Sequence, residues 1–464
     1  MNDTTATAPT APTGAPAAPE TARAIAEDDA RHLFRGWVQQ GTHRALPVAG
    51  AAGSWFWDHA GNRYLDFSSQ LVYTNLGHQH PRLVSAIQEQ AGKLCTIAPH
   101  FAEEQRATAA RKIAEVAPAG LERVLFTSSG AEAVEHAVRL ARLHTGRFKL
   151  LAAHHSFHGA TSTAIQLTGD PRRWRNDTGN AGVVRFFAPY LYRSSFYAEN
   201  EEQECLRALE HLEQVIVLEG ARTIAAIVLE PVGGTSSGVL VPPDGYLAGV
   251  RELCTRYGIM LILDEIMVGF ARTGAWFATD HWGVRPDLMT FAKGVNSGYL
   301  PLSGVLVGDE IVETFSATPY PGGSTYSGHP MACAVAVAAI DTMRDEGTVE
   351  HSARLGREVF GPELARIAER HPSVGEARGI GTIWALELVR NKKTKEMYVN
   401  YDTPDRLTPP GAQLMGALMQ RGVSAMVYLN RLNITPPCNI SEEDAREGLA
   451  RIDEALTVAD AHTH

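Results

Sequence analysis

The chain has 464 residues, of which 44% are hydrophobic and 20% charged, and its formal net charge is −10. This composition is typical of a globular protein with a large core, built as two domains or one elaborated domain. The acidic balance and the lack of a basic block argue against non-specific binding to nucleic acid or to an anionic membrane.

The termini and the cysteines give no sign of export or membrane insertion. Residues 1–25 are rich in Ala, Thr and Pro and lack the basic and apolar regions of a signal peptide, so we expect a disordered tail. The longest apolar runs, such as residues 332–340, are shorter than the roughly 20 residues of a membrane span. The five cysteines are scattered without a C-x-x-C pair, which predicts reduced thiols and a cytoplasmic location.

In chain order, residues 26–78 show helical spacing and then short strands around the turn at Gly61, which predicts the N-terminal segment of a small α+β domain. In residues 79–340, short apolar runs alternate with helical segments expected at 82–94, 103–116, 131–144, 201–219 and 245–257. That alternation predicts an α/β domain with a mostly parallel sheet, whose ligands bind at the carboxyl ends of the strands. Residues 341–464 form the expected C-terminal small domain.

The segment "FTSSGAEAVEHAVRLAR" places Ser129, Gly130 and Ala131 between a predicted strand and an amphipathic helix. Free backbone N–H groups and the helix dipole would then point at one spot, as in a phosphate-binding site. Taken alone, the same letters also fit an ordinary helix N-cap.

The segment "LAAHHSFHGAT" contains His154, His155 and His158, whose spacing could suit zinc. Further ligands and a regular helix face are missing, and Gly159 favours a loop after a strand. We therefore expect no metal here and expect Phe157 to lie against a flat ligand.

Two charged residues follow neighbouring apolar runs. Asp264 ends "GIMLILD", and Lys293 follows "LMTFA". "LILDEI" resembles the acidic strand of phosphate-loop NTPases, but the chain has no G-x-x-x-x-G-K-[ST] loop. A desolvated lysine can form a Schiff base, and a buried carboxylate needs a cation or donors. Together with an anion site, these residues fit pyridoxal 5′-phosphate (PLP), which has a phosphate, a basic ring nitrogen and an aldehyde.

The motifs "SFHG", "LEPVGG", "DEIMVGFARTG", "FAKGVNSGYLPLSGVLVG" and "TYSGHPMACAVAVAAI" occur in the order found in class III aminotransferases, which the chain resembles from the end of the tail onward. The resemblance implies the fold-type-I transferase fold, with a seven-stranded sheet in the large domain and a small domain formed from both termini. It also implies a homodimer or tetramer whose active sites are shared between subunits.

The resemblance further implies roles for individual residues. Lys293 would form the Schiff base and move the proton, while Asp264 would bond the pyridine nitrogen; Glu265 would have only structural bonds. Thr325 would reach the phosphate of the neighbouring subunit. The residues expected to bind the cofactor are Ser129, Gly130, Ala131, Phe157, His158, Gly159, Glu230, Asp264, Ile266, Lys293 and Thr325.

Several departures bear on the substrate. Met267 stands where relatives acting on ornithine or 4-aminobutyrate have glutamine, which is more similar to the ω-amino acid or amine:pyruvate branch and to taurine–pyruvate-type enzymes. The arginine that clamps the keto acid in that branch is replaced by Met426, so Arg431 or the pair Arg172 and Arg173 would take its place. The residues expected at the substrate are Val72, Tyr73, Arg172, Arg173, Tyr428 and Arg431.

The expected activity is transfer of an amino group from an ω-amino acid or amine to a keto acid, with pyruvate as the expected acceptor, by a ping-pong mechanism. The same cofactor residues would also serve an aminomutase, a racemase or a decarboxylase of this family. A non-catalytic PLP-binding protein is a further alternative, but it would require neither Lys293 nor Asp264.

Overall fold

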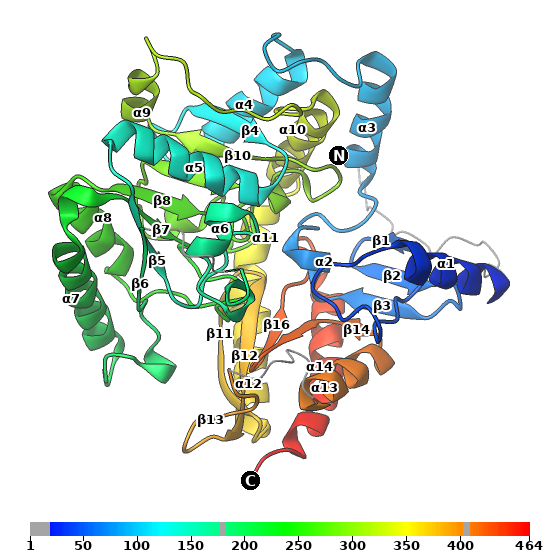
Figure 1. Ribbon diagram of the computed structural model, residues 1–464. Coiled ribbons are helices and arrows are strands. Elements are labelled where there is room, and N and C mark those ends of the chain that lie inside the picture. The colour runs from blue at the N-terminus through cyan, green and yellow to red at the C-terminus, as the bar shows by residue number, and fades with distance from the viewer. Residues whose placement is uncertain (1–18, 177–181, 402–408) are drawn as a thin grey trace, which may run out of the picture.

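The computed structural model describes residues 19–176, 182–401 and 409–464. Three sheets organise this part of the chain (Figure 1). A seven-stranded sheet occupies the upper half of the view, a five-stranded sheet lies below it, and a four-stranded sheet lies to the right.

The seven-stranded sheet has the order β4-β10-β9-β8-β7-β5-β6. Its strands are β4 (Arg123–Thr127), β5 (Lys149–Ala153), β6 (Val183–Phe186), β7 (Ile224–Leu229), β8 (Met260–Asp264), β9 (Leu288–Phe291) and β10 (Ser303–Val307). Neighbours from β9 to β6 pair in parallel, and β10 runs antiparallel between β4 and β9. The predicted, mostly parallel sheet is confirmed, and the carboxyl ends of all strands but β10 meet at one edge.

Both faces of this sheet are covered by helices because its strands are apolar on both faces. Successive side chains of a strand point to opposite faces. Ile262 therefore packs in the cluster with helix α5 (Gly130–Thr145), whereas Leu261 and Leu263 pack in the cluster with α7 (Glu201–Glu219) and α8 (Tyr246–Tyr257). The other half of that second face is covered by α10 (Pro330–Asp345), which packs on α3 (Pro81–Lys93) and α4 (Glu104–Val116).

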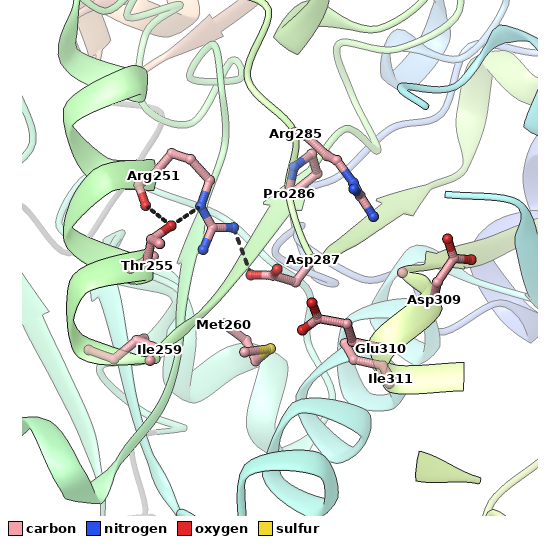
Figure 2. Close-up of a pocket in the computed structure, with 13 residues that line it drawn as sticks. Arg251, Thr255, Ile259, Met260, Arg285, Pro286, Asp287, Asp309, Glu310 and Ile311 are labelled. Carbon is pink, nitrogen blue, oxygen red and sulfur yellow. Dashed lines mark hydrogen bonds and ion pairs between the residues drawn. The ribbon is translucent and has the colours of Figure 1, made fainter. Parts of the chain in front are cut away.

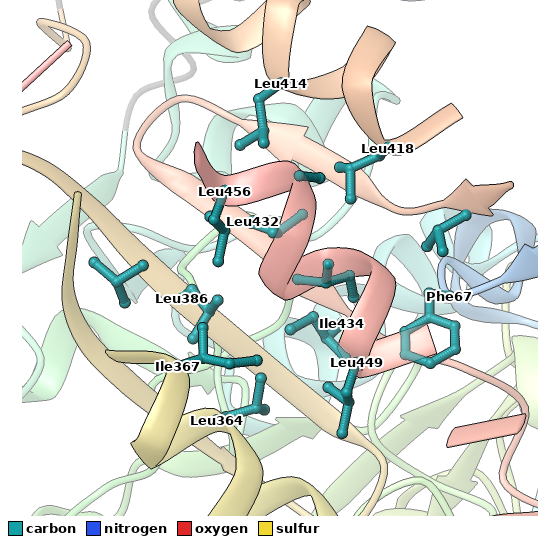
Figure 3. Close-up of a cluster of buried hydrophobic side chains, with 14 of the residues drawn as sticks. Phe67, Leu364, Ile367, Leu386, Leu414, Leu418, Leu432, Ile434, Leu449 and Leu456 are labelled. Carbon is teal, nitrogen blue, oxygen red and sulfur yellow. The ribbon is translucent and has the colours of Figure 1, made fainter. Parts of the chain in front are cut away.

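The two smaller sheets join the beginning of the chain to its end. The four-stranded sheet consists of β1 (Val48–Ala52), β2 (Trp55–Asp58), β3 (Arg63–Asp66) and β14 (Val423–Ser424). The other sheet consists of β11 (Val374–Ile380), β12 (Ile383–Asn391), β16 (Arg431–Ile434) and β15 (Met426–Tyr428), with β13 (Glu396–Met397) on β12. Phe67 belongs to the same buried core as Leu386, Leu432 and Leu449 (Figure 3). The N-terminal and C-terminal parts of the small domain therefore share one hydrophobic cluster.

The helices predicted between residues 82 and 257 are found within one residue of their expected ends at α3, α4, α5, α7 and α8. The remaining helices are α1 (Pro19–His32), α2 (Ser69–Val72), α6 (Ser162–Leu167), α9 (Asp309–Thr314), α11 (Thr348–Leu355), α12 (Gly361–Arg370), α13 (Pro409–Gln420) and α14 (Glu442–Asp460). Residues 19–25, expected in the disordered tail, begin α1 instead, because Ala, Glu and Arg are good helix formers there. Residues 1–18 lie outside the described residues.

No helix in the described ranges combines the length and apolar character that crossing a bilayer requires.

Candidate active site

The residues expected to bind the cofactor, other than Thr325, lie at the carboxyl edge of the seven-stranded sheet. Asp264 is the last residue of β8, and Lys293 follows β9 by two residues at the start of the short helix η5 (Lys293–Asn296). The other strand ends contribute Ser129 after β4, Phe157 and His158 after β5, and Glu230 after β7. Parallel strands place these distant segments side by side.

Asp264 is buried and is hydrogen-bonded through both of its carboxylate oxygens. Its side chain is 3% exposed, and Oδ2 lies 2.8 Å from Nδ1 of His158. Oδ1 accepts a bond from the Thr290 hydroxyl at 3.1 Å and another from the Ile266 N–H at 3.1 Å. Burial alone would lower the pKa of His158, but the bond to Asp264 and that carboxylate's charge raise it. The pair therefore holds a proton beside Asp264 and fixes the direction of its carboxylate.

Lys293 is held in a strained and desolvated position. Its φ is +46°, in the left-handed region that a non-glycine residue seldom adopts. Burial lowers its pKa although Asp264 and Glu230 act in the opposite direction, and the charge of Arg172 lowers it further. A lysine in this environment has a larger neutral fraction and can act as nucleophile or base.

The turn from β4 into α5 has the backbone arrangement expected of an anion cradle. Ser129 is the N-cap, and its hydroxyl accepts the N–H of Glu132 at 3.3 Å. The N–H groups of Gly130 and Ala131 stand in the first turn, where no helical carbonyl can accept them. A Cβ on Gly130 would lie 2.9 Å from Cδ1 of Ile266, so a larger residue here would have to displace the end of that side chain.

The segment after β5 closes against the same cradle. Gly159 has φ +135°, and a Cβ there would lie 2.7 Å from Cβ of Ala131. Glu230 fixes the start of this segment by accepting the Phe157 N–H at 3.2 Å, and it also accepts the Gly234 N–H at 3.0 Å. Burial raises the pKa of Glu230.

These groups fit PLP. The helix N-terminus suits a phosphate, Asp264 suits a protonated ring nitrogen, and Lys293 suits an aldehyde carbon. The buried Nε2 of His158 has no hydrogen-bond partner within the described ranges, which marks a polar position that a ligand or water would satisfy.

Two of the arginines expected at the substrate meet at a single residue. Arg172, in the short helix η1 (Pro171–Arg173), donates from Nε to Asp170 at 2.7 Å and from Nη2 to the Ser236 hydroxyl. Arg431, on β16, donates from Nη1 to the Ser236 carbonyl at 2.8 Å. The guanidinium of Arg172 also lies 3.7 Å from the ring centre of Phe157, which connects this pair with the cofactor residues.

Tyr428 joins this group, and the Arg173 backbone N–H donates to the Asp170 carbonyl at 3.2 Å. The Tyr428 hydroxyl donates to Asp170 at 3.2 Å, and its ring lies 5.4 Å from the Arg172 guanidinium. Val72 is 1% exposed with φ +61°, and the ring of Tyr73 packs on Gly298. Arg173 lies near His154, whose pKa is lowered by burial and by that charge.

Thr325 is exposed in the loop before α10, and the neighbouring Ser327 hydroxyl donates to the Phe126 carbonyl of β4 at 2.7 Å. Met267 lies under the turn after Glu230, where its sulfur accepts the Thr235 N–H at 3.2 Å. Met426 lies on β15 opposite Asn433.

The remaining candidates from the sequence have structural partners. His154 stacks on Phe187, and Nδ1 of His155 lies 3.2 Å from the Tyr401 hydroxyl, so the three histidines face different neighbours. Across the described ranges, no group of three or more His, Cys, Asp or Glu side chains is arranged to hold a metal. Glu265 accepts the N–H groups of Ala278 at 2.9 Å and Thr279 at 2.8 Å, which are hydrogen bonds of the expected structural kind.

A separate cavity of about 390 Å³ lies at the opposite edge of the sheet (Figure 2). Met260, the first residue of β8, lines it, whereas Asp264 is the last residue of the same strand. Arg251 and Asp287 are paired there at 2.7 Å, and Asp287 also accepts the Leu261 N–H. This cavity is distant from the lysine and the anion cradle and has no part in the candidate site.

Four residues that hold the site residues in place, Thr290, Asp170, Ser236 and Glu387, were not predicted from the sequence. Thr290 is a polar residue within the apolar run before Lys293, and Asp170 directly precedes "PRR", so both had a signal in the sequence. Ser236 and Glu387 had none, because their importance comes from contacts with residues distant in the chain.

Comparison with known proteins identifies the family. The family model for class III aminotransferases matches residues 38–456. Putrescine–pyruvate aminotransferase of Pseudomonas aeruginosa is 34% identical over 449 residues, with 94% of each chain covered. The structure of taurine:2-oxoglutarate aminotransferase from Bifidobacterium kashiwanohense, in complex with PLP and glutamate, superposes with a TM-score of 0.91 at 38% identity and covers 95% of this chain and 98% of that one.

An (S)-enantioselective ω-transaminase from Thermomicrobium roseum is also similar, with a TM-score of 0.89, 35% identity and coverage of 94% of this chain and 98% of that one. The chain therefore belongs to the class III aminotransferases, which are PLP-dependent transaminases of fold type I and include the ω-transaminases.

Proposed function

We propose that this transaminase moves an amino group from an ω-amino acid or amine to pyruvate in two half-reactions. The observation that supports this proposal is the meeting of Arg172 and Arg431 at Ser236, beside Phe157 and within electrostatic reach of Lys293. Two guanidinium groups at one position suit the carboxylate of a keto acid.

The side chains have distinct tasks. PLP, when bound, supplies an aldehyde carbon and a ring that withdraws electrons. Gly130 and Ala131 N–H groups would hold its phosphate, and Asp264, kept in place by His158, would hold the proton on its ring nitrogen. Lys293 Nζ, with its lowered pKa, takes the proton from the substrate carbon and returns it.

Pyruvate is proposed rather than a dicarboxylate because of the charges around Ser236. Within the described ranges, ion pairs around Ser236 join four arginines, Arg172, Arg193, Arg378 and Arg431, to three carboxylates, Asp170, Glu376 and Glu387. Among these seven residues one positive charge is left over, which matches one substrate carboxylate. A second carboxylate would need another cation to offset its desolvation.

We further propose a homodimer or tetramer in which Thr325, exposed in a single chain, completes the phosphate site of the neighbouring subunit. The free cysteines of the chain support a cytoplasmic location.

The test uses the cofactor's absorbance to follow each half-reaction separately. Putrescine, 5-aminovalerate and taurine serve as donors, and pyruvate and 2-oxoglutarate as acceptors. We expect at least one donor to convert the cofactor to its amine form and pyruvate to restore it at least about tenfold faster, in kcat/KM, than 2-oxoglutarate. Turnover without a second substrate would instead indicate a racemase, aminomutase or decarboxylase, and preference for 2-oxoglutarate would contradict the proposed acceptor.

A further inference from the structure

Ser236 lies in a buried turn that connects the cofactor residues with the five-stranded sheet. It is 5% exposed, and the turn is closed by the Ser237 and Gly238 N–H groups, which donate to the Gly234 carbonyl at 3.1 and 3.0 Å. Gly234 is itself bonded to Glu230 at 3.0 Å. The turn is therefore anchored to the cofactor side of the site.

The two oxygens of Ser236 accept different arginines. Its hydroxyl accepts Arg172, which belongs to the segment after β5, and its carbonyl accepts Arg431, which belongs to β16. Each guanidinium has five N–H donors, so these bonds orient the arginines without saturating them. The buried Nε of Arg431 has no hydrogen-bond partner within the described ranges, and the nearest carboxylate oxygen, on Glu387, is 3.8 Å away.

The arginines are also packed against the turn, which limits their movement. A Cβ on Gly238 would lie 2.5 Å from Nε of Arg431 and 2.6 Å from Nη2 of Arg378. Arg378 in turn donates to the Gly238 carbonyl at 2.6 Å and to Glu387 at 2.8 Å. Glu387 is shared with Arg193 as well, so it cannot neutralise Arg431 fully.

We propose that Ser236 is a positioning residue that directs Arg172 and Arg431 toward one anionic group of the substrate. Ser236 would thereby determine the enzyme's preference for a substrate with a single carboxylate. The inference rests on the proposed function for the identity of the substrate. The anion site that Arg172 and Arg431 form at Ser236 can be tested without turnover, because the two arginines and the turn are present in the protein alone.

The experiment compares Ser236→Ala and Ser236→Asp in the holoenzyme. Ser236→Ala removes one arginine contact and is expected to raise KM for pyruvate about threefold to tenfold with kcat unchanged. Ser236→Asp places a carboxylate between the arginines and cancels the surplus charge, so KM for pyruvate is expected to rise more than tenfold. The half-reaction with putrescine, which has no carboxylate, is expected to change less than twofold in both variants.

Acetate gives a readout that is independent of turnover. It should raise the melting temperature of the wild-type holoenzyme and inhibit competitively with pyruvate, and both effects should weaken at least about tenfold in Ser236→Asp. Thr457→Asp adds the same charge at an exposed position on α14 and should behave as wild type. The cofactor absorbance and melting temperature of each variant show whether it is folded, and Ser236→Ala remains informative if Ser236→Asp is not.

Equal losses with pyruvate and putrescine, or unchanged KM and acetate binding in both variants, would overturn the inference. If no amine reacts with the wild type but acetate still stabilises it and Ser236→Asp abolishes that effect, the proposed function fails while the anion site stands.

Discussion

The proposed cofactor side and the proposed substrate side of this site are built in different ways. On the cofactor side, Asp264, Lys293 and the turn at Gly130 each stand at the end of a strand of one sheet or just after it. The neighbouring residues in the sequence indicate the role of each, because an apolar run precedes each of them. On the substrate side, Arg172 and Arg431 come from segments about 260 residues apart and meet only at Ser236.

This difference has a chemical reason. The cofactor side must present the same phosphate, ring nitrogen and aldehyde sites in every turnover, and a rigid parallel sheet does so. The substrate side lies between the seven-stranded and five-stranded sheets, where Arg378, Arg431 and Tyr428 of the five-stranded sheet bond to loops of the other. Its specificity can therefore change by substitution without disturbing the cofactor.

The largest expected effect breaks the cofactor side alone. Lys293→Ala should abolish turnover while leaving the fold intact, because it removes the desolvated amine, whose pKa burial lowers, that is expected to react with the cofactor aldehyde. Steady-state assays check the turnover, and circular dichroism checks the fold. The wild type should be yellow with bound cofactor, whereas the variant should lack the absorbance of a cofactor joined to Lys293. An active Lys293→Ala enzyme would contradict the proposed role of the lysine.

Asp264→Asn tests the electronic role of the same side. We expect turnover to fall at least about a hundredfold with PLP still bound, because the N–H groups of the phosphate cradle remain while the carboxylate facing the ring is lost. Turnover and cofactor content are measured on the same preparation. A loss below tenfold would rule out this role, and loss of the cofactor itself would show that Asp264 mainly anchors it.

Arg431→Ala separates the two sides. KM for pyruvate should rise at least about tenfold, since removal of a charged hydrogen-bond partner costs about 1.5–3 kcal/mol. The half-reaction with an amine donor that has no carboxylate should change little. Single-turnover kinetics with each substrate decide the matter, with Arg431→Lys as the charge-conserving control. Equal losses for both substrates would indicate a structural arginine, and no loss would transfer the role to Arg172 or Arg173.

The smallest expected effect distinguishes the adjacent acids Asp264 and Glu265. Burial raises the pKa of Glu265 to about 8, against 4.5 for a free side chain, although two backbone N–H bonds oppose the shift. The folded state then binds a proton that the unfolded state releases above pH 4.5, so this contribution to stability is full at low pH and is lost as pH rises toward 8, by up to about 1.4 kcal/mol per unit.

Glu265→Gln should therefore flatten the decline of melting temperature between pH 5.5 and 8 without changing the ratio of activity with pyruvate to that with other acceptors. The measurement is the difference between wild type and variant at each pH, which removes the titration of shared groups. Identical pH profiles would mean that Glu265 is ionised in both states.

Much of the cofactor side could be predicted from the sequence because its signals are local. An apolar run followed by Asp264 or by Lys293 indicates a buried strand with a functional residue at its end, and "SSGAEA" indicates a helix N-terminus. The predicted helices and six of the seven strands of the large sheet follow from the same periodicity. The strand missed, β6, lies at the sheet edge and contains Arg185 within its short run, which weakens the apolar pattern.

Only the tertiary structure decided which arginines meet at one residue and how they share the described carboxylates. From the sequence, Arg172, Arg173 and Arg431 are all candidates for binding the keto-acid carboxylate, since an arginine's partners are set by its neighbours in space. The structure joins Arg172 and Arg431 through Ser236, and Glu387 is divided among three arginines. The charge balance of a buried site depends on the charges of all the segments that fold together there. The sequence therefore indicated the cofactor and the fold, whereas the packing of the sheets determined that Arg172 and Arg431 meet at Ser236.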